Sequence, residues 1–327
     1  MDFKRTLIVA ALPLAFCLSG LAQAEIKIKF AEVHPTGYPP VVAEQEMGKK
    51  LEAQSNGEIS FKMFAGGVLG SEKEVVEQVQ ANAVQMTRVS LGIVGPVVPD
   101  VNAFNLPFIF RDQAHMRKII DGEIGQEMLD KITNSEFNMV ALAWMDGGTR
   151  NLYTKKPVRS IADLKGMKIR VQGNPVFIDT INDMGGNGIA MATGEIFSAL
   201  QTGVIDGAEN NPPTFLEHNH YQNAKFYTMT EHLILPEPVV ISKTTWNKLN
   251  DDQKALVKKL AREAQMEERV LWDKKSAEAE TKLKASGVEF ISLTPEQKKA
   301  FYDATQPVRD KYGAPYKELI TRIEAVQ

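Results

Sequence analysis

The chain has 327 residues, of which 43% are apolar and 24% are charged. These are the values of an ordinary globular protein, and they exclude a disordered, collagen-like or low-complexity chain. The 38 Lys and Arg residues against 41 Asp and Glu residues leave a formal net charge of −3, so the composition gives no sign of a nucleic-acid partner. At about 100–200 residues per domain, the length predicts two domains.

Residues 1–24 have the features of a secretory signal peptide. Lys4 and Arg5 form a short positive region, residues 7–21 are almost wholly apolar, and Ala22-Gln23-Ala24 has the small-x-small pattern of a cleavage site. The alternative, an N-terminal membrane anchor, would need about 20 apolar residues. We therefore expect cleavage after Ala24 and an exported mature protein.

The only cysteine, Cys17, lies inside the predicted signal peptide. The mature chain therefore has no disulfide bonds and no thiol chemistry. Lipid attachment at Cys17 is an alternative, but the bulky Phe16 before it is unfavourable for that modification. The mass of the mature N-terminus would distinguish the two.

The first half of the mature chain alternates strand and helix patterns. We expect strands at 25–31, 58–64, 84–90 and 137–145, helices at 39–55, 112–120 and 123–134, and a further helix that begins at Ser71 and carries Val75, Val76 and Val79. Ser71 and Glu74 have the spacing of a capping box at the start of that helix. This alternation predicts a mainly parallel sheet with helices on its faces.

After Gly147-Gly148 the alternation starts again and predicts a second α/β unit. We expect strands at 168–171, 189–191 and 204–209, a helical turn at 160–166, and helices at 175–184 and 193–203. An extended apolar run at 233–242 follows, and a final strand at 288–291 precedes a helix capped by Thr294. Residues 251–286 contain neither Gly nor Pro. They predict a helix about 54 Å long, which either kinks or lies across both domains.

No enzyme signature stands out. The nucleophile elbow, the phosphate-binding loop and the zinc-protease motif are absent. His218 and His220 beside Glu217 could be metal ligands, but residues two apart do not share a helix face, so we expect no metal site. An exported α/β protein with two lobes and no catalytic set is typical of a binding protein whose ligand lies between the lobes.

Several segments, in order along the chain, carry a specific resemblance. They are Phe64-Ala-Gly-Gly-Val-Leu-Gly70, Leu106-Pro-Phe-Ile-Phe110, Gly148-Thr-Arg150, Asp163-Leu-Lys-Gly-Met-Lys-Ile-Arg-Val171, Glu195-Ile-Phe-Ser-Ala-Leu-Gln-Thr-Gly203 and Val204-Ile-Asp-Gly-Ala-Glu-Asn210. From about residue 26 to its end, the chain resembles the solute-binding proteins of TRAP (tripartite ATP-independent periplasmic) transporters.

The resemblance implies a fold, a location and a role. The fold is a two-lobed α/β periplasmic-binding-protein fold of type II-like topology, with lobe I at 25–147 plus 236–275 and lobe II at 148–235 plus 276–327. A monomeric periplasmic receptor would close on an organic acid and deliver it to the small and large membrane subunits of an ion-driven permease. Neither catalysis nor a cofactor is implied. Closure would bend or pivot the long helix, and we expect a break near 265–276.

The resemblance also assigns roles to three residues. Arg170 matches the arginine that clamps the ligand carboxylate, a role suited to its planar fork of donors. Arg150 matches a second arginine, and its alternative role is an ion pair with an acidic helix residue. Asn210 matches an asparagine that can donate and accept hydrogen bonds beside a carboxylate or hydroxyl, and otherwise would be a turn residue.

Other polar residues are further candidates. Glu237, between two prolines, would accept hydrogen bonds from sugar hydroxyls or be an exposed hinge residue. Arg88, in an apolar strand, either faces the cleft or is buried and paired. His34 lies at the carboxyl end of a strand, where α/β sheets bind ligands, or is a loop histidine. Glu74 either reaches the ligand or only completes its capping box.

Three neighbours of these residues complete the candidate set. Gln172 and Asn174 follow Arg170 and could bind hydroxyl groups. Asn211 departs from the proline often found at its position, and faces the ligand or forms a turn.

These side chains favour a sugar acid as the ligand. Two arginines indicate at least one carboxylate, and the further polar residues indicate several hydroxyls. Glu237 would repel a second carboxylate, which favours D-galacturonate or D-glucuronate over C4-dicarboxylates. The alternatives are a receptor for a C4-dicarboxylate, keto acid or aldonate, a secreted sugar-acid enzyme using Glu237 or His34 as a base, and a periplasmic scaffold or sensor.

Overall fold

The computed structural model describes residues 25–327, so the predicted signal peptide and Cys17 lie outside the described residues. The strands are β1 (Ile26–Ala31), β2 (Ile59–Phe64), β3 (Met86–Arg88), β4 (Met139–Thr154), β5 (Lys168–Val171), β6 (Asn187–Ala190), β7 (Gly207–Asn210), β8 (Phe226–Ser242) and β9 (Glu289–Ile291). The longer helices are α1 (Pro39–Gln54), α2 (Glu72–Gln80), α4 (Gln113–Asp121), α5 (Glu123–Asn134), α6 (Pro175–Asp183), α7 (Ile196–Thr202), α10 (Asp251–Ala285), α11 (Pro295–Ala304), α12 (Gln306–Gly313) and α13 (Lys317–Ala325). Short helices are α3 (Leu91–Val94), α8 (Pro212–Glu217) and α9 (Lys243–Trp246), with 3₁₀ turns at Pro99–Ala103, Ile161–Leu164, Thr193–Glu195, His220–Gln222 and Ala314–Tyr316.

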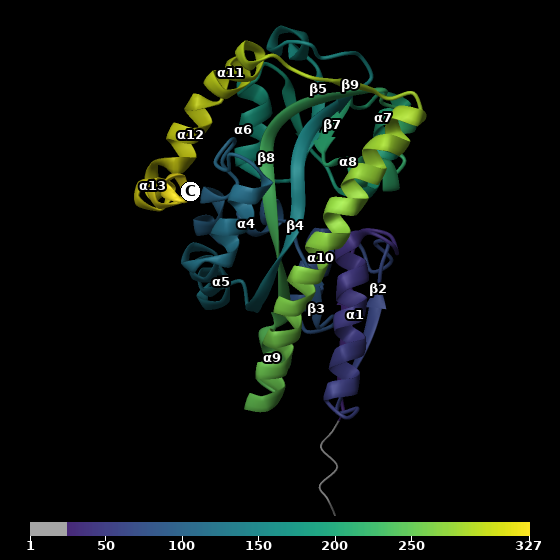
Figure 1. The fold of residues 1–327 in the computed structure, drawn as a ribbon, viewed down its shortest axis with the longest axis vertical. Coiled ribbons are helices and arrows are strands. Elements are labelled where there is room, and N and C mark those ends of the chain that lie inside the picture. Colours follow the sequence, from purple (N-terminus) through teal and green to yellow (C-terminus); the bar gives the residue numbers. More distant parts are fainter. Residues whose placement is uncertain (1–24) are drawn as a thin grey trace, which may run out of the picture.

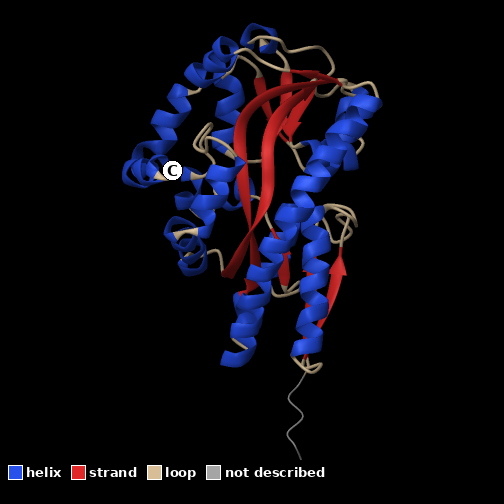
Figure 2. Ribbon diagram, viewed as in Figure 1, coloured by secondary structure: helices blue, strands red, loops and turns tan. Residues whose placement is uncertain are grey.

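The strands form one mixed sheet in the order β2-β1-β3-β8-β4-β7-β5-β6, and β9 pairs with β8. Helices lie on both sides of it (Figure 2). The outer pairs β1–β2, β1–β3, β5–β6 and β5–β7 are parallel, as the alternating pattern predicts. The middle of the sheet differs, because β8 is antiparallel to both β3 and β4, and β4 is antiparallel to β7.

The two central strands connect the halves of the molecule (Figure 1). β4 has 16 residues and β8 has 17, far more than the usual five or six. The strand expected at 137–145 is longer than predicted, since β4 runs through both Gly147 and Gly148 to Thr154. The two glycines allow a bulge, where the register with β8 shifts between Asp146 and Thr149. Gly148 has a φ of +70°, and a Cβ there would lie 2.3 Å from the Trp272 ring.

The long helix α10 runs along the molecule beside α1 in one half and reaches α8 in the other (Figure 1). It begins at an Asn250 capping box, as its sequence predicts. The expected break near 265–276 is absent, because α10 is a single helix of 35 residues. Its sequence contains neither Gly nor Pro, the residues that most often interrupt a helix.

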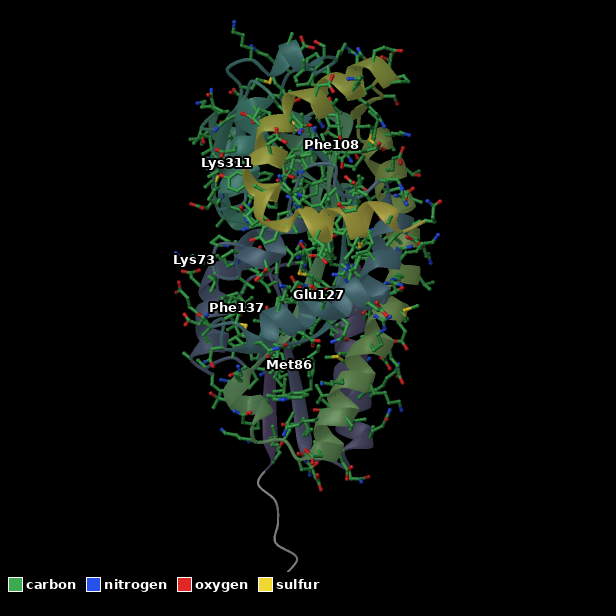
Figure 3. The ribbon with its side chains drawn as sticks, turned by 90° about the vertical axis from the view of Figure 1, so that its left-hand side faces the viewer. Lys73, Met86, Phe108, Glu127, Phe137 and Lys311 are labelled. Carbon is green, nitrogen blue, oxygen red and sulfur yellow. The ribbon has the colours of Figure 1, made fainter. Side chains whose placement is uncertain are left out.

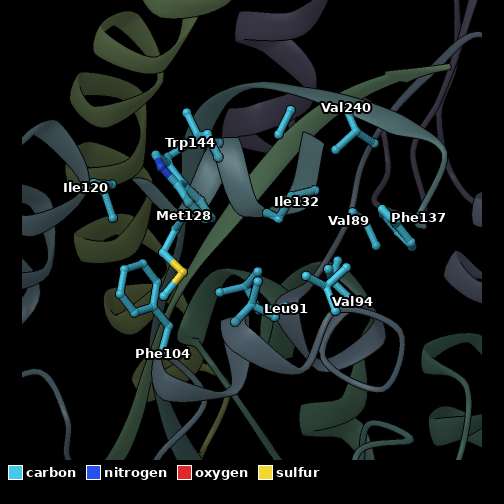
Figure 4. Close-up of a cluster of buried hydrophobic side chains, with 14 of the residues drawn as sticks. Val89, Leu91, Val94, Phe104, Ile120, Met128, Ile132, Phe137, Trp144 and Val240 are labelled. Carbon is cyan, nitrogen blue, oxygen red and sulfur yellow. The ribbon is translucent and has the colours of Figure 1, made fainter. Parts of the chain in front are cut away.

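The buried apolar side chains form separate clusters in the two halves. One cluster joins α3, α4, α5 and β4, where the rings of Phe104 and Trp144 lie 5.9 Å apart beside Met128 (Figure 4). A second packs α1 and α10 on β1 and β8. Two others surround β5, α6 and α11, and α7, β7 and α8.

The last helix returns to the first half of the molecule. Leu319 and Ile323 of α13 belong to the cluster around Trp144, and His115 of α4 contacts the Ile323 carbonyl at 3.0 Å. The side view shows the C-terminal helices passing across the face that carries Glu127 (Figure 3). Arg322 forms an ion pair with Glu127 at 2.8 Å. This packing places α13 with residues of the predicted lobe I, whereas the sequence assigned 276–327 to lobe II.

Candidate functional site

A small cavity lies where several strands end. Polar side chains line most of it. They are His34, Tyr38, Glu72, Arg150, Gln172, Thr193, Asn210, Asn211, Thr214 and Glu237. Its position at the carboxyl ends of β1, β5 and β7 is where α/β sheets usually bind ligands. Larger hollows elsewhere, such as one of about 670 Å³ beside Leu69, are open to solvent and hold no such set of buried polar groups.

The cavity brings together six of the ten candidate residues. These are His34, Arg150, Gln172, Asn210, Asn211 and Glu237. Arg88 and Arg170 are buried directly behind lining residues, and Glu74 and Asn174 are elsewhere. Tyr38, Glu72, Thr193 and Thr214 line the cavity and were not singled out as binding residues in the sequence.

Arg170, at the end of β5, is a buried cation with no acidic partner. Its Nε donates to the Met191 carbonyl at 2.8 Å, and Nη2 lies 3.3 Å from the Thr193 hydroxyl. Nη1 is buried and makes no hydrogen bond within residues 25–327. Burial lowers the pKa of Arg170, because no adjacent carboxylate offsets the loss of water. The side chain is 2% exposed, so this arrangement leaves donor capacity for an anion.

Arg150 has a different environment, because Glu209 of β7 holds it. Nη2 donates to Glu209 Oε1 at 2.7 Å, Nε donates to Oε2, and Nη1 donates to Asn210 Oδ1 at 3.1 Å. The alternative role of Arg150, an ion pair, is therefore realised, although with a strand residue and not a helix residue. Arg150 lines the cavity, but its charge is already compensated.

At the other side of the cavity, Arg88 of β3 is buried between two carboxylates. It donates to Glu32 from Nε at 2.7 Å and from Nη2 at 2.8 Å, and Nη1 donates to Glu237. His34 Nδ1 lies 2.8 Å from Glu32 Oε1. The pairing holds Glu237, of β8, at the cavity wall. Of the two roles that the sequence allowed for Arg88, the structure shows the second: Arg88 is buried and paired with acidic residues.

Two asparagines of the candidate set are helix caps. Asn174 accepts from the Val176 N–H and caps α6, while its Nδ2 donates to Asn102 Oδ1 at 3.1 Å. Asn211 accepts from the Thr214 N–H and caps α8, and it lines the cavity as well. In both cases an Asn-Pro pair begins the helix, which is a recognisable N-cap signal.

Glu74 does not reach the cavity, because its carboxylate completes the capping box with Ser71 on the surface. Hydrogen bonds from the Ser71 backbone and hydroxyl lower the pKa of Glu74. Glu72, at the first position of the same helix, faces the cavity instead and accepts from the Ser90 N–H at 3.1 Å.

His218 and His220 are both buried or nearly so, and they contact each other. Burial lowers the pKa of each to about 3. Their rings stack 5.5 Å apart, and Glu217 forms an ion pair with Lys275 at 2.6 Å. Within residues 25–327 no group of His, Cys, Asp and Glu side chains could hold a metal ion.

Comparison with known proteins identifies the family. Residues 30–314 match the family described as bacterial extracellular solute-binding protein, family 7. The chain belongs to this family. It is a solute receptor of the TRAP type. Among residues 25–327, no helix combines the length and apolar character that a membrane crossing needs.

Solved structures of this family are close to this receptor. A TRAP periplasmic solute-binding protein from Pseudomonas putida F1 with bound D-glucuronate has a TM-score of 0.91 and 78% identity, covering 92% of this chain and 98% of that one. One from Xanthobacter autotrophicus Py2 with bound β-D-galacturonate has a TM-score of 0.88 and 38% identity, covering 92% and 100%. A more distant sequence relative is the C4-dicarboxylate-binding periplasmic protein DctP of Rhodobacter capsulatus, 31% identical over 93% of this chain and 92% of that protein.

A third comparison bears on conformation. The TRAP solute-binding protein of Citrobacter koseri, 52% identical, is known with bound D-glucuronate and as an apo, open structure. Both cover 92% of this receptor and 99% of that chain, but the TM-scores are 0.90 for the glucuronate complex and 0.81 for the open form. The receptor described here is therefore closer to the ligand-bound form of that protein.

Proposed function

We propose that this receptor binds a hexuronate, D-glucuronate or D-galacturonate, and delivers it unchanged to the small and large membrane subunits of a TRAP permease. The mature protein would begin after Ala24 and act in the periplasm as a monomer without a cofactor. Its two lobes would close over the cavity. We assign α13 to lobe I, whereas the division drawn from the sequence had placed it in lobe II.

One observation carries this proposal: Arg170 is buried without a carboxylate partner. Among residues 25–327 the other buried arginines are each paired with an acid, Arg88 with Glu32, Arg150 with Glu209, and Arg269 with Asp121. An unpaired buried charge is unfavourable, and a ligand carboxylate would compensate it through charge-assisted hydrogen bonds. Arg170 would therefore be the clamp for the acid group.

The rest of the cavity suits the hydroxyl groups of a sugar. Glu237 can only accept hydrogen bonds when ionised, whereas Gln172, Asn210 and Thr193 can donate or accept. A hexuronate presents one carboxylate, which Arg170 would bind, and several hydroxyls, which these side chains would bind. The bound uronates of the Pseudomonas putida and Xanthobacter autotrophicus proteins support the same ligand class.

The test is a ligand panel on the mature protein, stripped of copurified ligand by unfolding and refolding. We expect D-glucuronate and D-galacturonate to raise the unfolding temperature and to give saturable heats by calorimetry, because a ligand that binds only the folded state stabilises it. D-Glucose, which lacks the carboxylate, serves as the control. Binding of succinate or a keto acid without any binding of uronates would overturn the ligand assignment.

The same samples separate a receptor from a sugar-acid enzyme. After prolonged incubation with D-glucuronate, mass spectrometry and NMR should recover the ligand chemically unchanged. A new product formed in proportion to protein concentration would contradict the receptor role.

A further inference from the structure

The charge of Glu237 at the cavity wall is cancelled by Arg88, so Glu237 alone does not make this wall negative. Arg88 carries one positive charge, and it contacts two carboxylates, Glu237 at the wall and Glu32 behind it. Glu32 is 2% exposed and does not line the cavity. The cluster of Glu32, Arg88 and Glu237 therefore has a net charge of −1 only because Glu32 is present.

Glu32 is ionised in this setting. Burial alone would raise its pKa, but the charge of Arg88 and the hydrogen bonds from His34 and Arg88 offset burial and lower the pKa to about 2. Burial raises the pKa of Glu44 well above its usual value and that of Tyr38 to about 12. His34 also contacts the cluster, with Nδ1 2.8 Å from Glu32 Oε1 and 2.7 Å from Arg88 Nη2.

The opposite side of the cavity is arranged differently. Arg150 and Glu209 compensate each other, and Arg170 is left to bind an anion, with Glu72 near it but forming no ion pair with it. Arg170 lies on β5, which β7 and β4 separate from β8 and Glu237. At about 4.8 Å between adjacent strands, three steps place the two strands about 14 Å apart. Among residues 25–327, Arg170 at one side of the cavity thus has no ion-pair partner, whereas the Glu32–Arg88–Glu237 cluster at the other side holds two carboxylates against one guanidinium.

We propose that Glu32, a residue that does not line the cavity, determines specificity by keeping the Glu32–Arg88–Glu237 cluster net negative, so that the receptor rejects acids with a second anionic group. The inference rests on the proposed function, because it assumes that Arg170 binds the first carboxylate. A diacid would place its second carboxylate against this cluster, where like charges repel. Arg88 is then a positioning residue that holds both carboxylates.

A matched pair of ligands tests the charge effect. D-Gluconate and D-glucarate are open-chain acids with the same carbon skeleton, and they differ only in carrying an alcohol or a carboxylate at the far end. Their dissociation constants are measured by calorimetry or by competition against D-glucuronate. The measurements are made at low salt, where screening is weak.

The deciding variant is Glu32→Gln, which removes one charge but leaves the cavity lining unchanged. The preference for gluconate over glucarate should fall about tenfold, the effect of one unit charge several ångströms away at an effective dielectric constant between 20 and 80. Glu237→Gln should reduce the same ratio, and it should also weaken uronate binding because it removes an acceptor at the wall. Glu74→Gln makes the same change in net charge on the surface and should leave the ratio unchanged.

The outcomes separate this inference from the proposed function. If the unmodified receptor binds no uronate, the proposed function fails. If it binds uronate but Glu32→Gln, shown to be folded by circular dichroism, does not shift the gluconate-to-glucarate ratio by more than twofold beyond Glu74→Gln, the charge role of Glu32 is wrong, whatever Glu237→Gln does. Binding of neither open-chain acid by any form would also overturn the inference, since relief of the charge would then not admit a diacid.

Discussion

Arg150 and Glu209 form a buried bidentate ion pair between β4 and β7, while Arg170, two strands away, has no carboxylate partner within residues 25–327. Glu209 is 0% exposed, so it depends on Arg150 to compensate its charge. The two arginines line or adjoin the same cavity, but their ion pairing differs. We therefore expect Arg150 to contribute to the stability of the ligand-free protein and Arg170 to contribute little.

Replacing Arg150 by alanine should strongly destabilise the protein. Glu209 would be left as an uncompensated buried carboxylate, a change that costs about 3–5 kcal/mol. Urea unfolding of the ligand-free protein measures this loss, and Arg170→Ala is the matched comparison, for which we expect a change below about 1 kcal/mol. Equal losses in the two variants would show that the roles of the arginines are not divided in this way.

Gly92 should be required for closure. A Cβ on Gly92 of α3 would lie 2.0 Å from Gln172 Oε1 and 2.6 Å from the Phe177 ring, and in the proposed division these residues belong to the other lobe. Gly92→Ala should therefore weaken uronate binding about tenfold or more, while the unfolding temperature of the ligand-free protein changes little.

Gly173→Ala is the control for that experiment. A Cβ at Gly173 meets no atom within 4 Å, although the residue is adjacent to Gln172. Its affinity for uronate should equal that of the unmodified protein. A loss of affinity in both variants, or in neither, would contradict the closure contact.

Stability should fall as the pH drops below about 6.5, the ordinary pKa of histidine. Burial lowers the pKa of His220 to about 3 and that of His232 to about 4 in the folded protein. The unfolded chain therefore takes up protons first, and stability is lost progressively from about pH 6.5 down to these folded-state values. Between about pH 6.5 and 5, each histidine should contribute a loss of roughly 1.5 kcal/mol.

His220→Gln isolates one of these contributions. The glutamine side chain can still accept a hydrogen bond from Tyr153, whose hydroxyl lies 2.8 Å from His220 Nδ1. Guanidinium unfolding at several pH values should show a shallower pH dependence in the variant. The same slope in both proteins would mean that His220 gains its proton in the folded state as readily as in the unfolded chain.

Local patterns predicted the secondary elements well, because caps and alternating apolar residues act over a few residues. The capping boxes at Ser71, Asn250 and Thr294 are present. The path of the chain at Gly147-Gly148 was not predictable in this way. Glycines mark both domain boundaries and bulges, and only pairing with β8 shows that β4 continues through them.

The candidate site was predicted in its residue types but not in its charge pairing. Arg150, Arg170 and Glu237 each carry a charge that a cleft could use, and the sequence does not show which charges are already compensated. Glu209, the partner of Arg150, and Glu32, the partner of Arg88, were not recognised, because each lies far along the chain from its arginine and meets it only across the sheet. A signal was available for Glu32, since it directly follows β1, as His34 does.

The clamp role of Arg170 has the most direct test. Calorimetry of D-glucuronate binding is compared between the unmodified protein, Arg170→Ala and Arg170→Lys, with Arg159→Ala, a surface arginine paired with Glu289, as the control. We predict a loss of about 100-fold or more in affinity for Arg170→Ala, a partial loss for Arg170→Lys, and no change in the ligand-free unfolding temperature or in the control. An affinity for Arg170→Ala within threefold of that of the unmodified protein would contradict the clamp.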